Sequence, residues 1–175
     1  MIRCHRGQTG PLRADPFARP ATRVGDRPGG ISYGAVTPEA TAVAEANLAF
    51  YRALEARDLD TMSAVWHHDE AVSCVHPGWH RLDGWEEVER SWANIFANSR
   101  PWAVSCEDMR IALAGDLAWV TCVEVIVPFG AEATEDAARM QATNLFGRVA
   151  GEWRLVHHHA SPSPTGDGDA EETVN

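Results

Sequence analysis

The stretch Phe50–Phe96, FYRALEARDLDTMSAVWHHDEAVSCVHPGWHRLDGWEEVERSWANIF, decides the fold of this chain. It opens inside an amphipathic helix, turns at Asp58 into a second short helix, passes through a short strand that ends at Pro77-Gly78, and finishes in a third helix. Helices grouped in this way around one brief strand indicate an α+β fold rather than alternating strand–helix units.

The three helices have readable starts and ends. Thr37-Pro38 supplies an N-cap followed by proline at the first helical position, which predicts a helix over residues 37–56. Asp58 caps a second helix over residues 59–65, so the two are expected to form a helical hairpin. From Gly84 to about Asn98, apolar residues three and four apart predict a third helix.

Residues after Pro101 change to a period of two, which predicts strands. One antiparallel pair turns at Gly115 and runs through residues 109–127, and a second pair covers residues 138–149 and 152–161. The strand over residues 117–127 is apolar on both faces, so we expect it at the centre of the sheet. The layer rules then favour a curved antiparallel sheet that wraps over the three N-terminal helices.

The two ends of the chain differ in composition from this middle part. Residues 1–36 are rich in Gly, Pro and Arg without hydrophobic periodicity, and we predict a disordered extension. Residues 163–175 are polar and acidic and predict a disordered tail. One folded domain is therefore expected over residues 37–162.

Composition excludes several functions. The net charge is −10, which disfavours nucleic acid as a partner, and the absence of lysine excludes Schiff-base chemistry and a P-loop.

The four cysteines are widely spaced, which indicates neither a zinc site nor a disulfide scaffold, and a reduced, cytoplasmic location is predicted. No apolar run is long enough to cross a membrane. We predict no cofactor and no membrane partner.

The quoted stretch, together with GEWRLVHHHAS at Gly151–Ser161, resembles the SnoaL-like branch of the nuclear transport factor 2 (NTF2)-like superfamily. The resemblance implies a cone-shaped α+β fold, a homodimer, and a pocket between the long helix and the concave face of the sheet. Relatives include ketosteroid isomerase, scytalone dehydratase and polyketide cyclases, which implies an apolar or ring-shaped ligand and a cofactor-independent isomerase, dehydratase or cyclase. The superfamily also includes the association domain of calmodulin-dependent kinase. That relative implies an alternative function for this chain, a non-catalytic homo-oligomerising association or binding domain.

His76 is the candidate catalytic residue. It lies before Pro77, at what resembles the place where ketosteroid isomerases carry an Asp base, and an imidazole can act as a general base near neutral pH. Those isomerases usually carry a tyrosine hydrogen-bond donor on the first helix. The resemblance places Phe50 at that position, and phenylalanine cannot donate a hydrogen bond. Tyr51 is its neighbour and is expected about 100° round the helix.

Further side chains are candidates for the ligand pocket. Trp79 and Trp92 fit either a pocket wall or the core, and one of Thr143 and Asn144 should face inward. The predicted pocket residues are Tyr51, Trp79, Trp92, Thr143, Asn144, His157 and His159. His157 and His159 share one face of the last strand and His158 takes the other; chelation by this pair would need a third ligand such as His76 or Glu124, and no metal is predicted.

Glu124 interrupts an otherwise apolar strand face. A carboxylate there either pairs with an arginine or carries a raised pKa, and the ion pair is the favoured interpretation. The candidate partners are Arg139, Arg148 and Arg154 on neighbouring strands. Cys74, Cys106 and Cys122 are expected to be buried thiols.

Overall fold

The computed structural model describes residues 32–33, 37–130 and 137–163 of the 175-residue chain. The predicted disordered tail, apart from Ser163, lies outside these residues, as does nearly all of the predicted disordered extension. Ser32–Tyr33 from that extension forms a short strand, β1, paired with Leu113 and Ala112. A two-residue edge strand is held by backbone pairing, so hydrophobic periodicity gives no signal for it.

All three helices begin and end close to their predicted positions. α1 covers Pro38–Ala56, and the N–H of Ala40 donates to Oγ1 of Thr37 at 3.1 Å. α2 covers Leu59–Val65 and is capped by Asp58, and α3 covers Trp85–Asn98. None of the helices in the described residues is long and apolar enough to span a bilayer.

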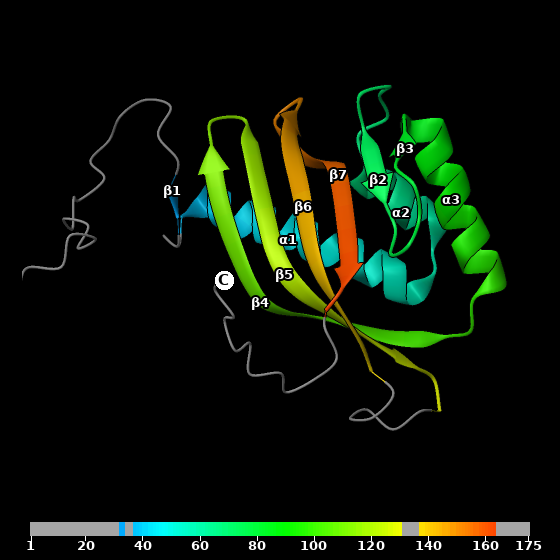
Figure 1. The fold of residues 1–175 in the computed structure, drawn as a ribbon. Helices are drawn as coiled ribbons and strands as arrows, with labels where there is room; N and C mark the ends of the chain where they lie inside the picture. The colour runs from blue at the N-terminus through cyan, green and yellow to red at the C-terminus, as the bar shows by residue number, and fades with distance from the viewer. Residues whose placement is uncertain (1–31, 34–36, 131–136, 164–175) are drawn as a thin grey trace, which may run out of the picture.

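The remaining elements form one curved sheet, with α1 lying across one of its faces (Figure 1). The order is β1-β4-β5-β6-β7-β2-β3, and β5 lies near the centre as expected. The strands are β2 (Ser73–Val75), β3 (Leu82–Asp83), β4 (Trp102–Ala114), β5 (Leu117–Pro128), β6 (Ala138–Val149) and β7 (Glu152–Pro162). The sheet is antiparallel except that β2 joins β7 in parallel, a non-local pairing that the sequence did not predict. The predicted α+β cone is confirmed.

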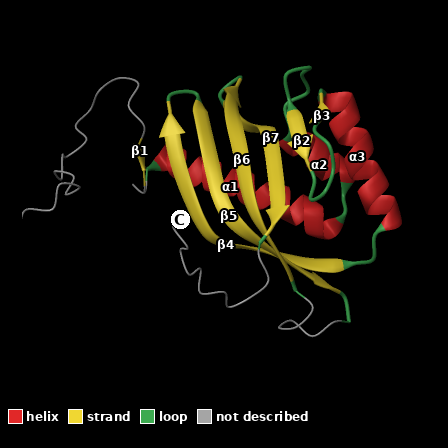
Figure 2. Cartoon of the chain, viewed as in Figure 1, coloured by secondary structure: helices red, strands yellow, loops and turns green. Residues whose placement is uncertain are grey.

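The core lies between α1 and the concave face of the sheet, with α2 and α3 closing the side near β2 and β3 (Figure 2). Alternate residues of β5 face α1 and are buried, from Ala118 to Glu124. Phe50 and Val43 of α1 are completely buried against them. The other face of β5 carries alternate residues that are exposed or partly exposed, apart from the buried Val125.

β7 contains a bulge that changes which of its side chains face inward. Leu145 pairs with His157 while its neighbour Phe146 pairs with Leu155, so Val156 is an extra residue on β7. Leu155 is buried before the bulge, and His158 is buried after it. The inward face therefore passes from odd-numbered to even-numbered positions at Val156.

Candidate functional site

Among the described residues, six polar side chains are buried in the interior of this otherwise apolar core. They are Asn47, His76, Ser91, Glu124, Asn144 and His158, none more than 6% exposed. α1 contributes Asn47, α3 contributes Ser91, and the others come from the sheet or its end. A buried polar group is costly without hydrogen bonds, so the partners of these groups show what the interior can do.

Tyr51 of α1 connects directly to Glu124 of β5. The Tyr51 hydroxyl donates to Oε1 of Glu124 at 2.9 Å and lies 3.1 Å from Sγ of Cys122. It accepts a hydrogen bond from Nδ2 of Asn144 at 3.2 Å. Tyr51 and Phe50 are both buried, and their rings meet edge to face. The sequence therefore located Tyr51 within reach of the interior but did not identify its carboxylate partner.

Asn144 fixes the orientation of His158. Its Nδ2 donates to Tyr51 and to Oδ1 of Asn47 at 2.8 Å, so its own Oδ1 is an acceptor. Nδ1 of His158 lies 2.6 Å from that oxygen and must carry the proton. In the neutral ring, Nε2 of His158 then has a free lone pair, and this atom lies 3.9 Å from Oε1 of Glu124.

Burial moves the protonation equilibria of these groups in opposite directions. Burial raises the pKa of Glu124 to about 7, against the hydrogen bond from Tyr51, which lowers it. Burial lowers the pKa of His158 to about 3, helped by the nearby His76, His157 and His159. The result is a carboxyl group that can take up or release a proton near neutral pH beside an imidazole that stays neutral.

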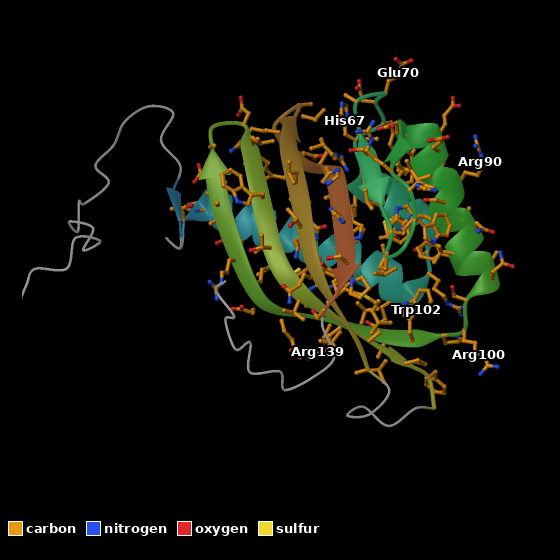
Figure 3. All side chains as sticks on the ribbon, in the orientation of Figure 1. His67, Glu70, Arg90, Arg100, Trp102 and Arg139 are labelled. Atoms are coloured by element: carbon orange, nitrogen blue, oxygen red, sulfur yellow. The ribbon has the colours of Figure 1, made fainter. Side chains whose placement is uncertain are left out.

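The predicted ion pair of Glu124 with an arginine is wrong. Each candidate arginine pairs elsewhere: Arg139 with Glu107 at 2.8 Å, Arg148 with Asp116 at 3.3 Å, and Arg154 with Glu152. Figure 3 labels Arg139 toward the lower end of the sheet as drawn. Glu124 is 2% exposed, and the long guanidinium side chains keep their charge in contact with water instead. The raised pKa, the other interpretation of the sequence, describes this residue.

His76 lies at the end of β2, as the sequence predicted, and is 3% exposed. Ser91 has one hydroxyl hydrogen, which it donates to the carbonyl of Val88 at 2.6 Å. Nε2 of His76, 2.8 Å from the same hydroxyl, must therefore be the donor, which leaves a lone pair on Nδ1. Burial lowers the pKa of His76 to about 4, so it is a neutral base at physiological pH.

The two tryptophans predicted near the pocket both contact His76. Trp92 is 3% exposed, and its ring meets His76 edge to face with centroids 4.5 Å apart. Trp79 also meets His76 edge to face, at 5.0 Å, but is 44% exposed. The indole N–H of Trp92 is buried and has no hydrogen-bond acceptor among the described residues. Trp92 is thus an interior residue, whereas Trp79 lies over the His76 turn at the surface.

The predicted pocket positions on β6 and β7 need correction. Asn144 faces inward and is fully buried, whereas Thr143 takes the outer face and is half-buried. His157 and His159 also lie on the outer face, where His157 bonds Oγ of Ser73 at 2.8 Å. The bulge at Val156 is the reason, because it brings His158 inward instead. The two outward histidines therefore cannot converge with His76 or Glu124 on a shared ion.

Glu124 has two partly exposed neighbours on the concave face of the sheet. Its neighbours across the sheet are Cys106 on β4 and Met140 on β6, and both are partly exposed although they face inward. Ile95 and Phe96 of α3 are also partly exposed and pack against the same core.

Two hollows lie elsewhere in the described residues, away from this cluster. One, of about 690 Å³, lies at the start of α3 and is lined by residues that include His68 and Trp85, and the second, of about 390 Å³, lies beside Trp66 and Arg154. Neither is lined by a residue of the buried polar cluster.

Sequence reasoning missed His158 and Asn47 as members of the site. Asn47 could have been noticed, because it is a polar residue within the apolar stripe of α1. His158 could not have been chosen over its neighbours, because its direction depends on the bulge.

Comparison with known proteins places this geometry in a family context. Residues 43–165 match the family described as SnoaL-like domain. A Streptomyces avermitilis structure named "putative dehydratase from the NTF2-like family" is 39% identical, covering 73% of this chain and 99% of that one with a TM-score of 0.66. A Thiobacillus denitrificans structure named "putative calcium/calmodulin-dependent protein kinase type II association domain" is 34% identical, covering 73% and 96% with a TM-score of 0.64.

A curated relative is the F-box protein SKIP8 of Arabidopsis thaliana, 28% identical over 120 residues. The match covers 69% of this chain, which spans about half the length (49%) of that relative.

Proposed function

The chain belongs to the SnoaL-like domain family within the NTF2-like superfamily, and on that premise we propose that it is a cofactor-independent proton-transfer enzyme acting on a neutral, apolar or ring-shaped small molecule. The reaction class is dehydration, isomerisation or cyclisation. One observation carries the proposal: Glu124 is a buried carboxyl held by the Tyr51 hydroxyl at 2.9 Å and faced by neutral His158 at 3.9 Å.

Glu124 is the proton carrier in this proposal. Its carboxylate removes a proton from a carbon next to a carbonyl group, and the resulting acid returns that proton to a leaving hydroxyl in a dehydration or to another carbon in an isomerisation. Glu124 ends the cycle in its starting state, so no other proton source is required. A pKa near the operating pH suits a group that must both accept and return a proton.

The surrounding groups have separate roles. Tyr51 holds the Glu124 carboxylate, and Asn144 holds Tyr51 and His158. The free indole N–H of Trp92 is a donor for the carbonyl oxygen of the substrate, where negative charge develops. His76, with its Nδ1 lone pair, remains a second candidate base, as the sequence suggested.

The first experiment measures ligand-induced thermal stabilisation of the full chain. The probes are a 3-ketosteroid, a hydroxylated naphthalene and an aliphatic β-hydroxy ketone, tested against wild type, Glu124→Gln and His76→Ala. A ligand at a hundredfold excess over its dissociation constant stabilises the native state by about 2.7 kcal/mol. Any stabilising probe is then assayed for turnover. Stabilisation of both wild type and Glu124→Gln, with turnover in wild type alone, supports Glu124 as the catalytic group, whereas equal turnover refutes it.

The second candidate function is a non-catalytic association domain. The Thiobacillus denitrificans relative supports it, as does the outer sheet face, where Leu117 is 40% exposed and Trp119 and Val123 share its side of β5. A second copy of this chain is the proposed occupant of that face, in a homodimer that either function would use. The two functions are separated by the interior: an association domain tolerates Glu124→Gln without loss, because nothing in its role needs the carboxyl group.

A further inference from the structure

Cys106 and Cys122 lie at diagonal positions on neighbouring strands, on the same face of the sheet. Cys106 pairs with Glu124 across the β4–β5 ladder, and Cys122 lies two residues before Glu124 on β5, so both side chains face α1. Side chains at such diagonal positions of neighbouring strands are within reach of each other. A register shift in β4 between Glu107 and Arg110 lies immediately beside this diagonal pair and loosens the local ladder.

The two thiols differ in access and in environment. Cys106 is partly exposed, whereas Cys122 is 4% exposed. The neighbouring Cys122 thiol lowers the pKa of Cys106, and the hydrogen bond from Nδ2 of Asn47, at 3.8 Å, acts in the same direction against burial and the charge of Glu124. The same pairing and burial raise the pKa of Cys122. A small oxidant therefore meets Cys106 first, and in the more reactive form.

We propose that Cys106 and Cys122 are a reversible redox pair, in which Cys106 reacts with hydrogen peroxide and Cys122 resolves the product to a disulfide. This function is independent of the proton-transfer chemistry, although Glu124 lies beside both sulfurs.

The chemistry balances in two steps. The Cys106 thiolate attacks one peroxide oxygen; an S–O bond forms, the O–O bond breaks, and the departing hydroxide takes up a proton to become water. Cys122 then attacks the sulfur of the Cys106 sulfenic acid; the S–S bond forms, the S–O bond breaks, and hydroxide leaves with the Cys122 proton as a second water. The two thiols lose two electrons, and the peroxide gains them. A dithiol reductant reverses the change.

Oxidation would also change the polar cluster. Sγ of Cys122 lies 3.1 Å from the Tyr51 hydroxyl, and Sγ of Cys106 accepts from Asn47. A disulfide has no S–H to donate and draws both sulfurs away from these partners. Tyr51 would then keep Glu124 and Asn144 as its partners.

The test is peptide mapping of the folded chain after mild peroxide treatment. Cys4 lies outside the described residues and is replaced by Ser in all samples, to remove the fourth thiol. The samples are alkylated, unfolded, alkylated with a second reagent, and digested. The expected product is one peptide pair joined through Cys106 and Cys122, lost on reduction. Alkylation of both cysteines as free thiols after treatment, or crosslinking to Cys74 at equal yield, overturns the proposal.

Cys74 is the internal control. It is fully buried, burial raises the pKa of its thiol, and its sulfur faces His76 rather than another thiol among the described residues. Cys74→Ser should leave the crosslink unchanged. Cys122→Ser should trap Cys106 as a sulfenic acid that dimedone labels, and Cys106→Ser should leave Cys122 reduced. If either variant fails to fold by circular dichroism, the wild-type crosslink still decides the outcome.

Discussion

The Tyr51 hydroxyl donates a hydrogen bond to Oε1 of Glu124 at 2.9 Å, across the interior between α1 and β5. This contact joins the longest helix to the centre of the sheet through a phenol and a carboxyl group, both nearly inaccessible to water. Burial and the negative charge of Glu124 raise the pKa of Tyr51, so the phenol keeps its proton and remains a donor. The pair therefore stabilises the fold only while both groups have their partners.

Glu124→Gln should remove one component of the pH dependence of stability. The folded pKa of Glu124, about 7, lies above the ordinary value of 4.5, so the folded state holds a proton that the unfolded state releases. Its contribution is complete below the ordinary pKa and is lost as pH rises through 7. Relative to the variant, wild type should lose up to roughly 3 kcal/mol over this interval, at about 1.4 kcal/mol per pKa unit.

Urea unfolding from about pH 4.5 to pH 8 measures this difference. His76 and His158 have the opposite effect, because their lowered pKa values remove stability as pH falls from 6.5 toward about 4 and about 3. Both histidines remain in both proteins, so their contribution largely cancels in the difference. Glu45→Gln makes the same change on the exposed side of α1 and is the control. A difference curve that is flat with pH would contradict the raised pKa of Glu124.

Tyr51→Phe should destabilise the protein and raise the pKa of Glu124 further. The variant keeps the ring but removes the donor to Glu124 and the acceptor of the Asn144 N–H. Leaving buried polar groups without partners costs about 1–3 kcal/mol. Thermal unfolding and the pH profile of urea unfolding measure both effects. Wild-type stability together with an unchanged pH profile would show that the hydrogen bond does not form in solution.

His158→Ala should be far more costly than His159→Ala, although the residues are adjacent. His158 packs against Phe50 with ring centroids 5.0 Å apart and donates to Asn144, whereas His159 is exposed. The buried truncation should cost about 2–4 kcal/mol through the cavity and the unpaired amide. The exposed one should change stability by no more than about 0.5 kcal/mol. Equal losses in chemical denaturation would mean that the bulge at Val156 is absent.

These histidines also show how far the sequence predicts the site. Helix bounds, hairpins and the position of His76 depend on local signals such as caps, turns and periodicity, and they were predictable. The direction of His158 depends on an extra residue in β7, and the partner of Glu124 depends on which helix residue crosses the interior. Both are properties of long-range pairing. Strand periodicity alone cannot reveal them, because one inserted residue reverses every later side chain.

Thr121→Arg should weaken the proposed homodimer. Thr121 is exposed on the outer face of β5, on the same side as Trp119 and Val123, where a second copy would cover it. In a symmetric dimer, one substitution places two like charges at the same interface and leaves them desolvated. Light scattering coupled to size-exclusion chromatography should give twice the 19.1 kDa chain mass for wild type and a concentration-dependent shift toward the monomer for the variant.

Arg90→Glu is the control, since Figure 3 shows Arg90 pointing into solvent from α3, and it should stay dimeric. Monomeric wild type at micromolar concentration would refute the dimer.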